Sequence, residues 1–336
     1  MKKTIALTMA LGLTLGACLS FSACKKENIP AEEITVFMPD GAPALAFAEL
    51  MHEDKEDDGV TYRVVNTSTE AGVLPLVSQL TNADAEKNAD FCVLPLTAAV
   101  QKCGTGEAYA LLGLVTQGNL YLVSKDSAQY DKNNVADLKG KTVVVKQMLQ
   151  VPGQTLKAAL ERNGVEWSTY EGGEKQADKV NLAAQADSYD LEVLAEPAVS
   201  KRLGMNAGWN VVGDLQELYG DCGLGNDGYP QAVLIAKKEF VNERVDWTKT
   251  FVEKIAAGKE WLYTATAEDI YGAVEAHGYE AGQTPLFSVE NLSVETRRRC
   301  GIQFTYAMQA RTAIEGYLTE TGGALPNAAF YWEYQK

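Results

Sequence analysis

The chain has 336 residues, of which 46% are hydrophobic and 22% charged, and its formal net charge at pH 7 is −15. These values are typical of a globular protein long enough for two domains, and they exclude a largely disordered chain. The acidic balance argues against a nucleic-acid partner and against electrostatic docking on anionic lipid. Arg297-Arg298-Arg299 is the one basic run, and we expect it to lie on a solvated helix face.

Residues 1–23 have the features of an export signal. Two lysines precede an apolar stretch, residues 5–21, which ends in small residues before Cys24. This end resembles a bacterial lipobox, which implies that Cys24 carries the lipid and that residues 24–32 form a polar tether. Cys18 is the alternative lipidation site, and an ordinary secretory signal is the other interpretation. No later stretch is apolar and long enough to span a bilayer.

Strands and helices alternate from residue 33 to about residue 116. We expect strands at residues 34–38, 61–66, 89–94 and 108–116, and helices at residues 42–53, 67–82 and 97–102. The turn Pro39-Asp40-Gly41 leads into a helix whose Pro43 suits a first turn. Thr67 and Glu70 have the spacing of a capping box. This alternation predicts a parallel sheet with helices on its faces.

A second alternating stretch follows, and the last hundred residues have a helical pattern. Strands are expected at residues 120–124, 142–146, 191–194, 210–212 and 231–236, with helices at residues 154–163, 178–186 and 197–203. Further helices are expected at residues 241–264, 267–276 and 289–318, with no strand among them. We therefore predict lobe one from residues 33–118 and 237–336, and lobe two from residues 119–236. The chain would cross near Gly118-Asn119 and near residues 228–236.

Five short motifs occur in a fixed order along this pattern. They are Gly41-Ala42-Pro43, Leu94-Pro95-Leu96-Thr97, Asp137-Leu138-Lys139-Gly140-Lys141, Glu196-Pro197-Ala198 and Tyr229-Pro230-Gln231. Together they resemble the α/β type II periplasmic-binding-protein fold, above all the ABC-transporter solute-binding proteins for alkanesulfonates, taurine, nitrate and thiamine-precursor pyrimidines. The resemblance implies two lobes with mainly parallel sheets, two hinge crossings and a C-terminal helical segment packed on lobe one.

The same resemblance implies a function and a set of partners. Such a protein is a monomeric receptor that is held on the outer side of the cell membrane by its lipid and needs no cofactor or metal. It delivers a small molecule to a cognate ABC permease. A sensor lipoprotein without transport, or an enzyme similar to pyrimidine-precursor synthases, is the alternative of another class. The two histidines, His52 and His277, lie outside the predicted ligand turns, and we predict no enzyme.

Ligand contacts in such a fold come from turns at the carboxyl ends of strands. The candidates are Asp40, Gly41, Ala42, Asn66, Thr67, Ser68, Pro95, Leu96, Thr97, Gln117, Asn119, Gln147, Gln150, Gly153, Glu196 and Tyr229. For five of them a purely structural role stays open, namely a turn for Asp40, a helix cap for Thr67 and for Thr97, a first-turn acid for Glu196 and a core position for Tyr229.

The expected ligand follows from the side chains in these turns. None of the turns contains an arginine, which favours a neutral, amine or heteroaromatic ligand, such as a pyrimidine on which Tyr229 could stack. A sulfonate, taurine or nitrate receptor is the alternative. The cysteines of the mature chain, Cys92, Cys103, Cys222 and Cys300, match no zinc-binding spacing, and free thiols and a disulfide both stay open.

Overall fold

The structure, a computed structural model, describes residues 33–53, 59–68, 71–82, 88–125, 130, 134–205, 208–225 and 228–333. These residues lie within one compact unit, Glu33–Lys336. The export signal, the tether and both candidate lipidation sites, Cys18 and Cys24, lie outside the described residues. In the part of the chain that is described, no helix combines the length and the apolar character needed to cross a membrane.

The described residues form twelve strands, twelve α-helices and three 3₁₀ helices that can be bounded. The strands are β1 (Ile34–Pro39), β2 (Val60–Val65), β3 (Phe91–Pro95), β4 (Tyr109–Gln117), β5 (Leu120–Ser124), β6 (Thr142–Val144), β7 (Trp167–Thr169), β8 (Val180–Ala183), β9 (Leu191–Ala195), β10 (Asn210–Asp214), β11 (Pro230–Lys237) and β12 (Ile302–Tyr306). The helices are α1 (Ala42–Leu45), α2 (Ala48–Glu53), α3 (Leu74–Ser78), α4 (Leu96–Cys103), α5 (Val151–Arg162), α6 (Ala198–Gly204), α7 (Leu215–Tyr219), α8 (Lys238–Glu243), α9 (Val245–Thr264), α10 (Ala267–Ala276), α11 (Val294–Arg299) and α12 (Ala307–Glu320). Short 3₁₀ turns lie at η3 (Val135–Leu138), η4 (Val289–Asn291) and η5 (Ala328–Phe330).

The first sheet has the strand order β12-β4-β11-β3-β1-β2. Only β1 with β2 and β1 with β3 pair in parallel, whereas β11 pairs antiparallel with β3 and β4, and β12 antiparallel with β4. A mainly parallel sheet is therefore wrong for this half of the molecule. The reason is that β11 and β12 come from the second half of the sequence and run back into a sheet begun by β1–β4.

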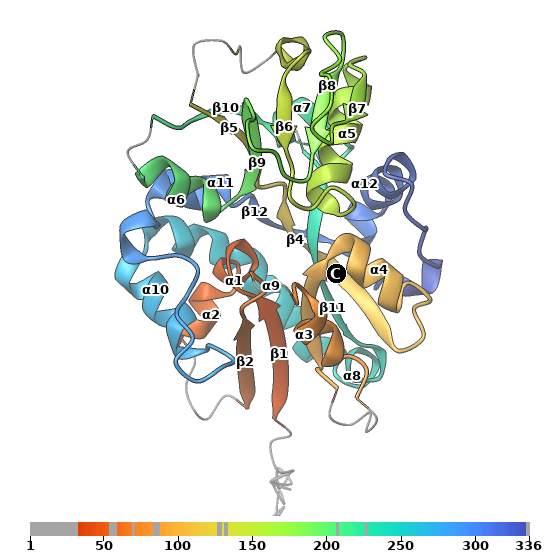
Figure 1. Cartoon of the computed structure of the whole chain (residues 1–336). Helices are drawn as coiled ribbons and strands as arrows, with labels where there is room; N and C mark the ends of the chain where they lie inside the picture. The colour runs from red at the N-terminus through yellow and green to blue at the C-terminus, as the bar shows by residue number, and fades with distance from the viewer. Residues whose placement is uncertain are drawn as a thin grey trace, which may run out of the picture. The chain divides into compact units, whose positions relative to one another are not determined.

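The second sheet has the order β10-β5-β9-β6-β8-β7, in which β6 to β9 pair in parallel and β5 and β10 antiparallel. The predicted helix at residues 178–186 is wrong, because β8 occupies its middle. All four residues of β8 are buried between β6 and β7, so the strand lacks the alternation that would have revealed it. Figure 1 shows this sheet above the first, with helices around both.

Two other predicted helices are also corrected. The stretch 289–318 contains η4, α11, strand β12 and α12, because Gly301 adopts φ +61° after α11 and lets the chain turn into a strand beside β4. The helix expected at residues 67–82 is only α3 in the described residues. Pro75 lies in the first turn of α3, where its missing N–H is tolerated, but it would interrupt a longer helix. Glu70 of the expected capping box lies outside the described residues.

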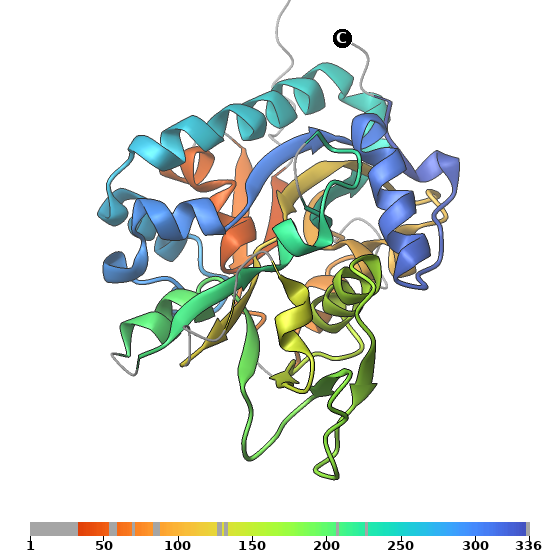
Figure 2. The same ribbon diagram turned by 90° about the horizontal axis from the view of Figure 1, so that it is seen from above.

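Helix α12 links the two halves of the molecule. It follows β12 of the first sheet, yet the Tyr317 hydroxyl lies 2.8 Å from the Thr155 hydroxyl in α5, and Glu320 pairs with Arg162 of α5 at 2.7 Å. Figure 1 shows α12 beside α5, and Figure 2 shows α9 running across the first sheet, whose face it covers. The C-terminal segment therefore packs on both halves, not on the first alone.

The chain passes between the two sheets at two places. β4 ends at Gln117 and β5 begins at Leu120, so the first crossing consists of Gly118 and Asn119. The second lies before β11, which belongs entirely to the first sheet. Residues 230–236, which we expected in lobe two, are therefore strand residues of the first sheet.

Candidate functional site

A cleft lies where the turns after the strands of the two sheets face each other, and its volume is about 700 Å³. The β1–α1 turn, the start of α4 and the crossing residues line it from the first sheet, and the turns before α5 and after β9 line it from the second. Of the predicted residues, the structure brings together Asp40, Ala42, Thr67, Pro95, Thr97, Asn119, Gln147, Gln150 and Glu196. The carboxyl ends of strands are where open α/β sheets hold their ligands.

The predicted residues that do not line the cleft have structural roles. Leu96 is fully buried in the core. The Asn66 carboxamide oxygen accepts hydrogen bonds from the backbone N–H and the hydroxyl of Ser68, so this turn is closed on itself. The Gln117 amide donates to the Thr305 hydroxyl at 2.7 Å and fastens β4 to β12.

Both predicted glycines support the backbone instead. Gly41 adopts φ +100°, a conformation that side chains rarely adopt, and its N–H donates to Asp40. Gly153 lies in the first turn of α5, where an added Cβ would approach the Met148 carbonyl oxygen to 2.2 Å. Neither glycine lines the cleft, so each shapes the turn that presents its neighbours.

Tyr229 is a core residue. Its side chain is fully buried, its ring stacks on Tyr317 at 5.9 Å between centroids, and it meets Tyr219 edge-on at 5.7 Å. Burial raises the pKa of its hydroxyl well above 10. The three rings come from α7, the second crossing and α12, so they join the two halves. Tyr229 packs on these tyrosines and does not offer its ring to a ligand in the cleft.

Asp40 lines the cleft, but its carboxylate oxygens already accept hydrogen bonds from backbone N–H groups. Oδ1 accepts the N–H of Gly41 at 2.6 Å, and Oδ2 accepts the N–H of Leu286 at 3.0 Å. Burial raises the pKa of this carboxyl, and the bonds from Leu286 and Gly41 oppose that rise. Asp40 therefore ties the β1–α1 turn to the segment after α10, which is the structural role left open above.

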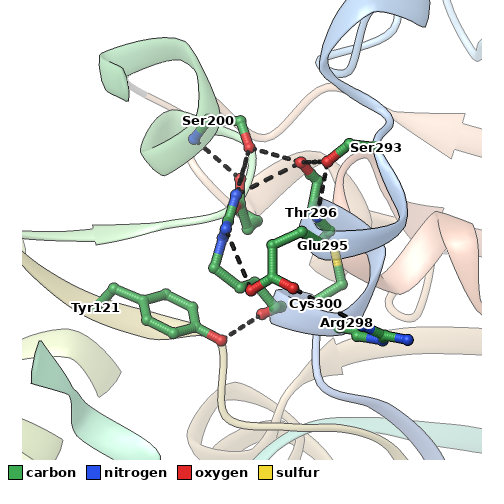
Figure 3. Close-up of polar contacts among 9 residues, drawn as sticks. Tyr121, Ser200, Ser293, Glu295, Thr296, Arg298 and Cys300 are labelled. Atoms are coloured by element: carbon green, nitrogen blue, oxygen red, sulfur yellow. Dashed lines mark hydrogen bonds and ion pairs between the residues drawn. The ribbon is translucent and has the colours of Figure 1, made fainter. Parts of the chain in front are cut away.

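Glu196 has a charged partner that the sequence did not reveal. Its Oε1 lies 2.5 Å from Nε of Arg299, and both of its oxygens accept bonds from Ser200, one from the hydroxyl and one from the backbone N–H, each at 3.1 Å. The Tyr121 hydroxyl donates to the Arg299 carbonyl, and the hydroxyls of Ser200 and Thr296 lie 2.9 Å apart. Figure 3 shows Tyr121, Ser200 and Thr296 around this cluster. The Glu196 side chain is fully buried and its charge is neutralised from outside the cleft.

The basic run is therefore not a solvated face, as we had expected. Arg299 pairs with Glu196, and Arg297 is 4% exposed and donates to three backbone carbonyls, those of Leu262, Ala265 and Leu292. Burial lowers the pKa of Arg297. Only Arg298, with 68% of its side chain exposed, matches the expectation.

No protein-family model and no curated protein matches the chain. Solved structures do resemble it. An ABC transporter protein from Parabacteroides distasonis aligns with a TM-score of 0.63 and 20% identity over 90% of this chain and 100% of the other. The ligand-binding component of an ABC-type import system from Staphylococcus aureus, with zinc bound, aligns at 0.56 and 10% over 89% and 96%. The alkanesulfonate-binding protein SsuA from Xanthomonas axonopodis, bound to MOPS, aligns at 0.55 and 12% over 90% and 98%.

The chain has the type II periplasmic-binding-protein fold. The cleft wall of this chain is rich in side-chain amides and hydroxyls. Six carboxamides line it, namely Gln101, Asn119, Gln147, Gln150, Gln154 and Gln231, together with Thr67, Thr97 and Thr116. Among the described residues, no lysine, arginine, histidine or aromatic side chain does so.

Four of these polar residues were missed by sequence reasoning: Gln101, Thr116, Gln154 and Gln231. Gln231 could have been predicted from the sequence, because it ends the Tyr229-Pro230-Gln231 motif. In the structure its amide donates to the Asn119 oxygen at 2.5 Å. Gln154 lies in the first turn of α5, and Gln150 is the residue that precedes this helix. The buried oxygens of Gln154 and Gln231 accept no hydrogen bond from a described residue.

Other chemistry is sparse around the cleft. Across the described part of the chain, no group of three or more His, Cys, Asp or Glu side chains could hold a metal ion. The four cysteines of the described residues are free thiols, and burial raises the pKa of Cys103 and of Cys222 to about 11. His52 stacks near Trp261, and Nδ1 of His277 lies 2.7 Å from the Ala273 carbonyl, so both histidines lie away from the cleft.

Proposed function

We propose that this chain is the extracytoplasmic solute-binding component of an ABC importer, which captures a small organic molecule in the cleft and passes it to a membrane permease. The observation that carries the proposal is the cleft itself. It is formed by the strand ends of two sheets, in a fold shared with solved ABC import components. Its volume of about 700 Å³ is within the range of small-molecule sites.

The remaining parts of the proposal come from the sequence. Cys24 would carry the lipid that holds a monomeric receptor at the outer side of the membrane, and two acyl chains would make this anchor stable. Lobe one would contain the first sheet, including β11, and lobe two the second sheet. Binding without chemical change is the favoured activity, because no histidine or cysteine of the described residues lines the cleft.

For the ligand, the wall supports an uncharged molecule. The acids of the wall already have partners, which weakens the case for an amine, and the wall lacks an aromatic platform for a pyrimidine. The alternative of a sulfonate or nitrate receptor is less favoured, since no basic side chain of the described residues faces the cleft. Backbone N–H groups at the start of α5 are the one feature in its favour.

A thermal-shift panel on the full-length chain in detergent tests the proposal. Sulfonates, amines, pyrimidines, vitamins and neutral amides are screened, and a true ligand at 100 times its Kd should stabilise the fold by about 2.7 kcal/mol. Gln150→Ala should weaken that ligand, whereas Gln309→Ala, an exposed glutamine of α12 outside the cleft, should not. A melting curve unmoved by the whole panel, together with no bound small molecule in native mass spectrometry, would contradict the proposal.

A further inference from the structure

The cleft has two chemically different ends. One end lies between the β1–α1 turn and the β9–α6 turn and holds Asp40 and Glu196, the two ionisable side chains of the described wall. Both carboxylates already have partners within the protein. The oxygens of Asp40 accept hydrogen bonds from backbone N–H groups, and Glu196 is paired with Arg299 and Ser200. The charge of Glu196 is therefore neutralised, and the oxygens of Asp40 are partly occupied.

The other end combines apolar side chains with carboxamides and holds no ionisable side chain of the described wall. It lies between α4, the start of α5 and the segment after α12, which Figure 1 shows on the opposite side of the molecule from α1 and α6. Val100, Leu149, Val151 and Leu318 line it beside the glutamines of the same segments, Gln101, Gln147, Gln150 and Gln154. Leu149 is the informative residue, because it belongs to the cleft wall yet is 84% exposed. An exposed leucine inside a cleft offers apolar surface that a bound molecule can cover.

Two further exposed leucines are sequence neighbours of wall residues. Leu74 is 65% exposed and follows Val73, and Leu325 is 56% exposed and follows Ala324. Neither of them lines the cleft, so Leu149 is the exposed leucine of the described wall.

We propose that the ligand is uncharged and amphipathic, which rests on the solute-binding function proposed above. A head group with N–H or O–H donors lies against the carboxamides of Asn119 and Gln231, and an apolar portion extends over Leu149. The Gln231 amide donates to the Asn119 oxygen, and the buried Gln231 oxygen accepts no hydrogen bond from a described residue. The ligand is therefore neither a small inorganic anion nor a simple amine.

Homologous probe series test this inference directly. Straight-chain primary carboxamides from butanamide to octanamide are titrated into the full-length chain by calorimetry, beside alkanesulfonates and alkylamines of the same chain lengths. The affinity of the amides should rise about fourfold with each methylene group, and each amide should bind at least tenfold more tightly than the sulfonate or amine of equal length. Leu149→Ala should reduce the gain in affinity per methylene group. Met205→Ala is the matched control, since Met205 is 70% exposed outside the cleft.

Each other outcome overturns the inference in a distinct way. Tighter binding of the sulfonate or amine series shows a charged ligand and leaves the solute-binding function intact. Amide affinities that do not change with chain length, or a gain that survives Leu149→Ala, show that the ligand does not contact Leu149 through an apolar portion. If none of the series binds, the inference is wrong, and the broader thermal-shift panel then decides the solute-binding function separately.

Discussion

The Glu196 carboxylate and the Arg299 guanidinium meet between the two sheets, with Oε1 and Nε 2.5 Å apart. Glu196 follows β9 of the second sheet, and Arg299 ends α11, just before β12 of the first. Their side chains are 0% and 15% exposed, so little water screens the pair. The pair therefore fastens one flank of the cleft, while the contacts of α12 fasten the other.

Replacing Arg299 by glutamine should destabilise the fold by about 3 kcal/mol or more, because it leaves the buried Glu196 carboxylate without its charged partner. Chemical denaturation measures this change. The neighbouring Arg298→Gln is the matched control, since that side chain is 68% exposed and its substitution should change the free energy of unfolding by less than about 0.5 kcal/mol. Equal effects of the two substitutions would contradict the buried pair.

A double-mutant cycle separates the pair from its surroundings. Glu196→Gln together with Arg299→Gln removes both charges, so the double variant should be more stable than Arg299→Gln alone. If the loss of stability in the double variant equals the sum of the losses in the two single variants, the residues do not interact.

Gly301 should tolerate no side chain. An added Cβ would approach the Gly118 carbonyl oxygen to 2.0 Å, and the residue adopts φ +61°. We expect Gly301→Ala to destabilise the protein by about 2 kcal/mol or more, because the first crossing must move. Gly316→Ala in α12 is the control: nothing lies within 4 Å of its added Cβ, so it should stabilise the helix by roughly 0.5–1 kcal/mol. Thermal and urea denaturation of both variants check the opposite signs.

The contacts of the Glu320 carboxylate with Arg162 and Tyr219 should weaken in acid. Burial tends to raise the pKa of Glu320, but the bonds from the Arg162 guanidinium and the Tyr219 hydroxyl outweigh it and lower the pKa below its ordinary value of 4.5. A lowered folded-state pKa means that its stabilisation is present above pH 4.5 and lost as the pH falls through the lowered value. The difference between wild type and Glu320→Gln should thus be largest at neutral pH, and at most about 1 kcal/mol because the side chain is 37% exposed. Urea titrations from pH 3 to 7 measure it, and a difference that grows in acid would contradict the assignment.

Asp40→Ala should lower stability whether or not ligand is present. It leaves the backbone N–H groups of Gly41 and Leu286 without acceptors, which should cost at least about 2 kcal/mol. Burial raises the pKa of Asp40 above 3.8. The stabilisation that comes from its titration is therefore fully present below pH 3.8 and is lost as the pH rises through the raised pKa. This pH dependence is opposite to that of Glu320. Asp187→Ala, an exposed carboxylate, serves as control. A loss of ligand affinity at unchanged stability would instead make Asp40 a ligand contact.

The repeated strand–helix pattern predicted the fold class, because buried strands such as β1, β3 and β9 have apolar runs followed by turn residues. It also predicted that turns after strands would meet, and the cleft contains Asp40, Thr97 and Glu196 as expected. Local patterns are sufficient for these features, since strand ends in one sheet must share an edge.

Contacts between distant residues were not predictable in the same way. Arg299 meets Glu196 at a sequence separation of 103 residues, and nothing near either residue marks the other. β12 lies within a stretch whose pattern predicted a helix. The only turn residue before it is Gly301, and the need for glycine there comes from the Gly118 carbonyl, which is distant in the sequence. Tyr229 is in the core because two other tyrosines from α7 and α12 pack against it.

The position of α12 limits how the cleft can open. A body attached only at two adjacent crossings can swivel freely, but a third attachment to one side restrains that rotation. To open the cleft, Tyr317 must separate from Thr155, or α12 must travel with the second sheet while the chain bends at Tyr306-Ala307, where strand passes directly into helix. We therefore expect the rate of solute release to follow the lifetime of the α12 contacts, measurable by hydrogen exchange at the amides of α5.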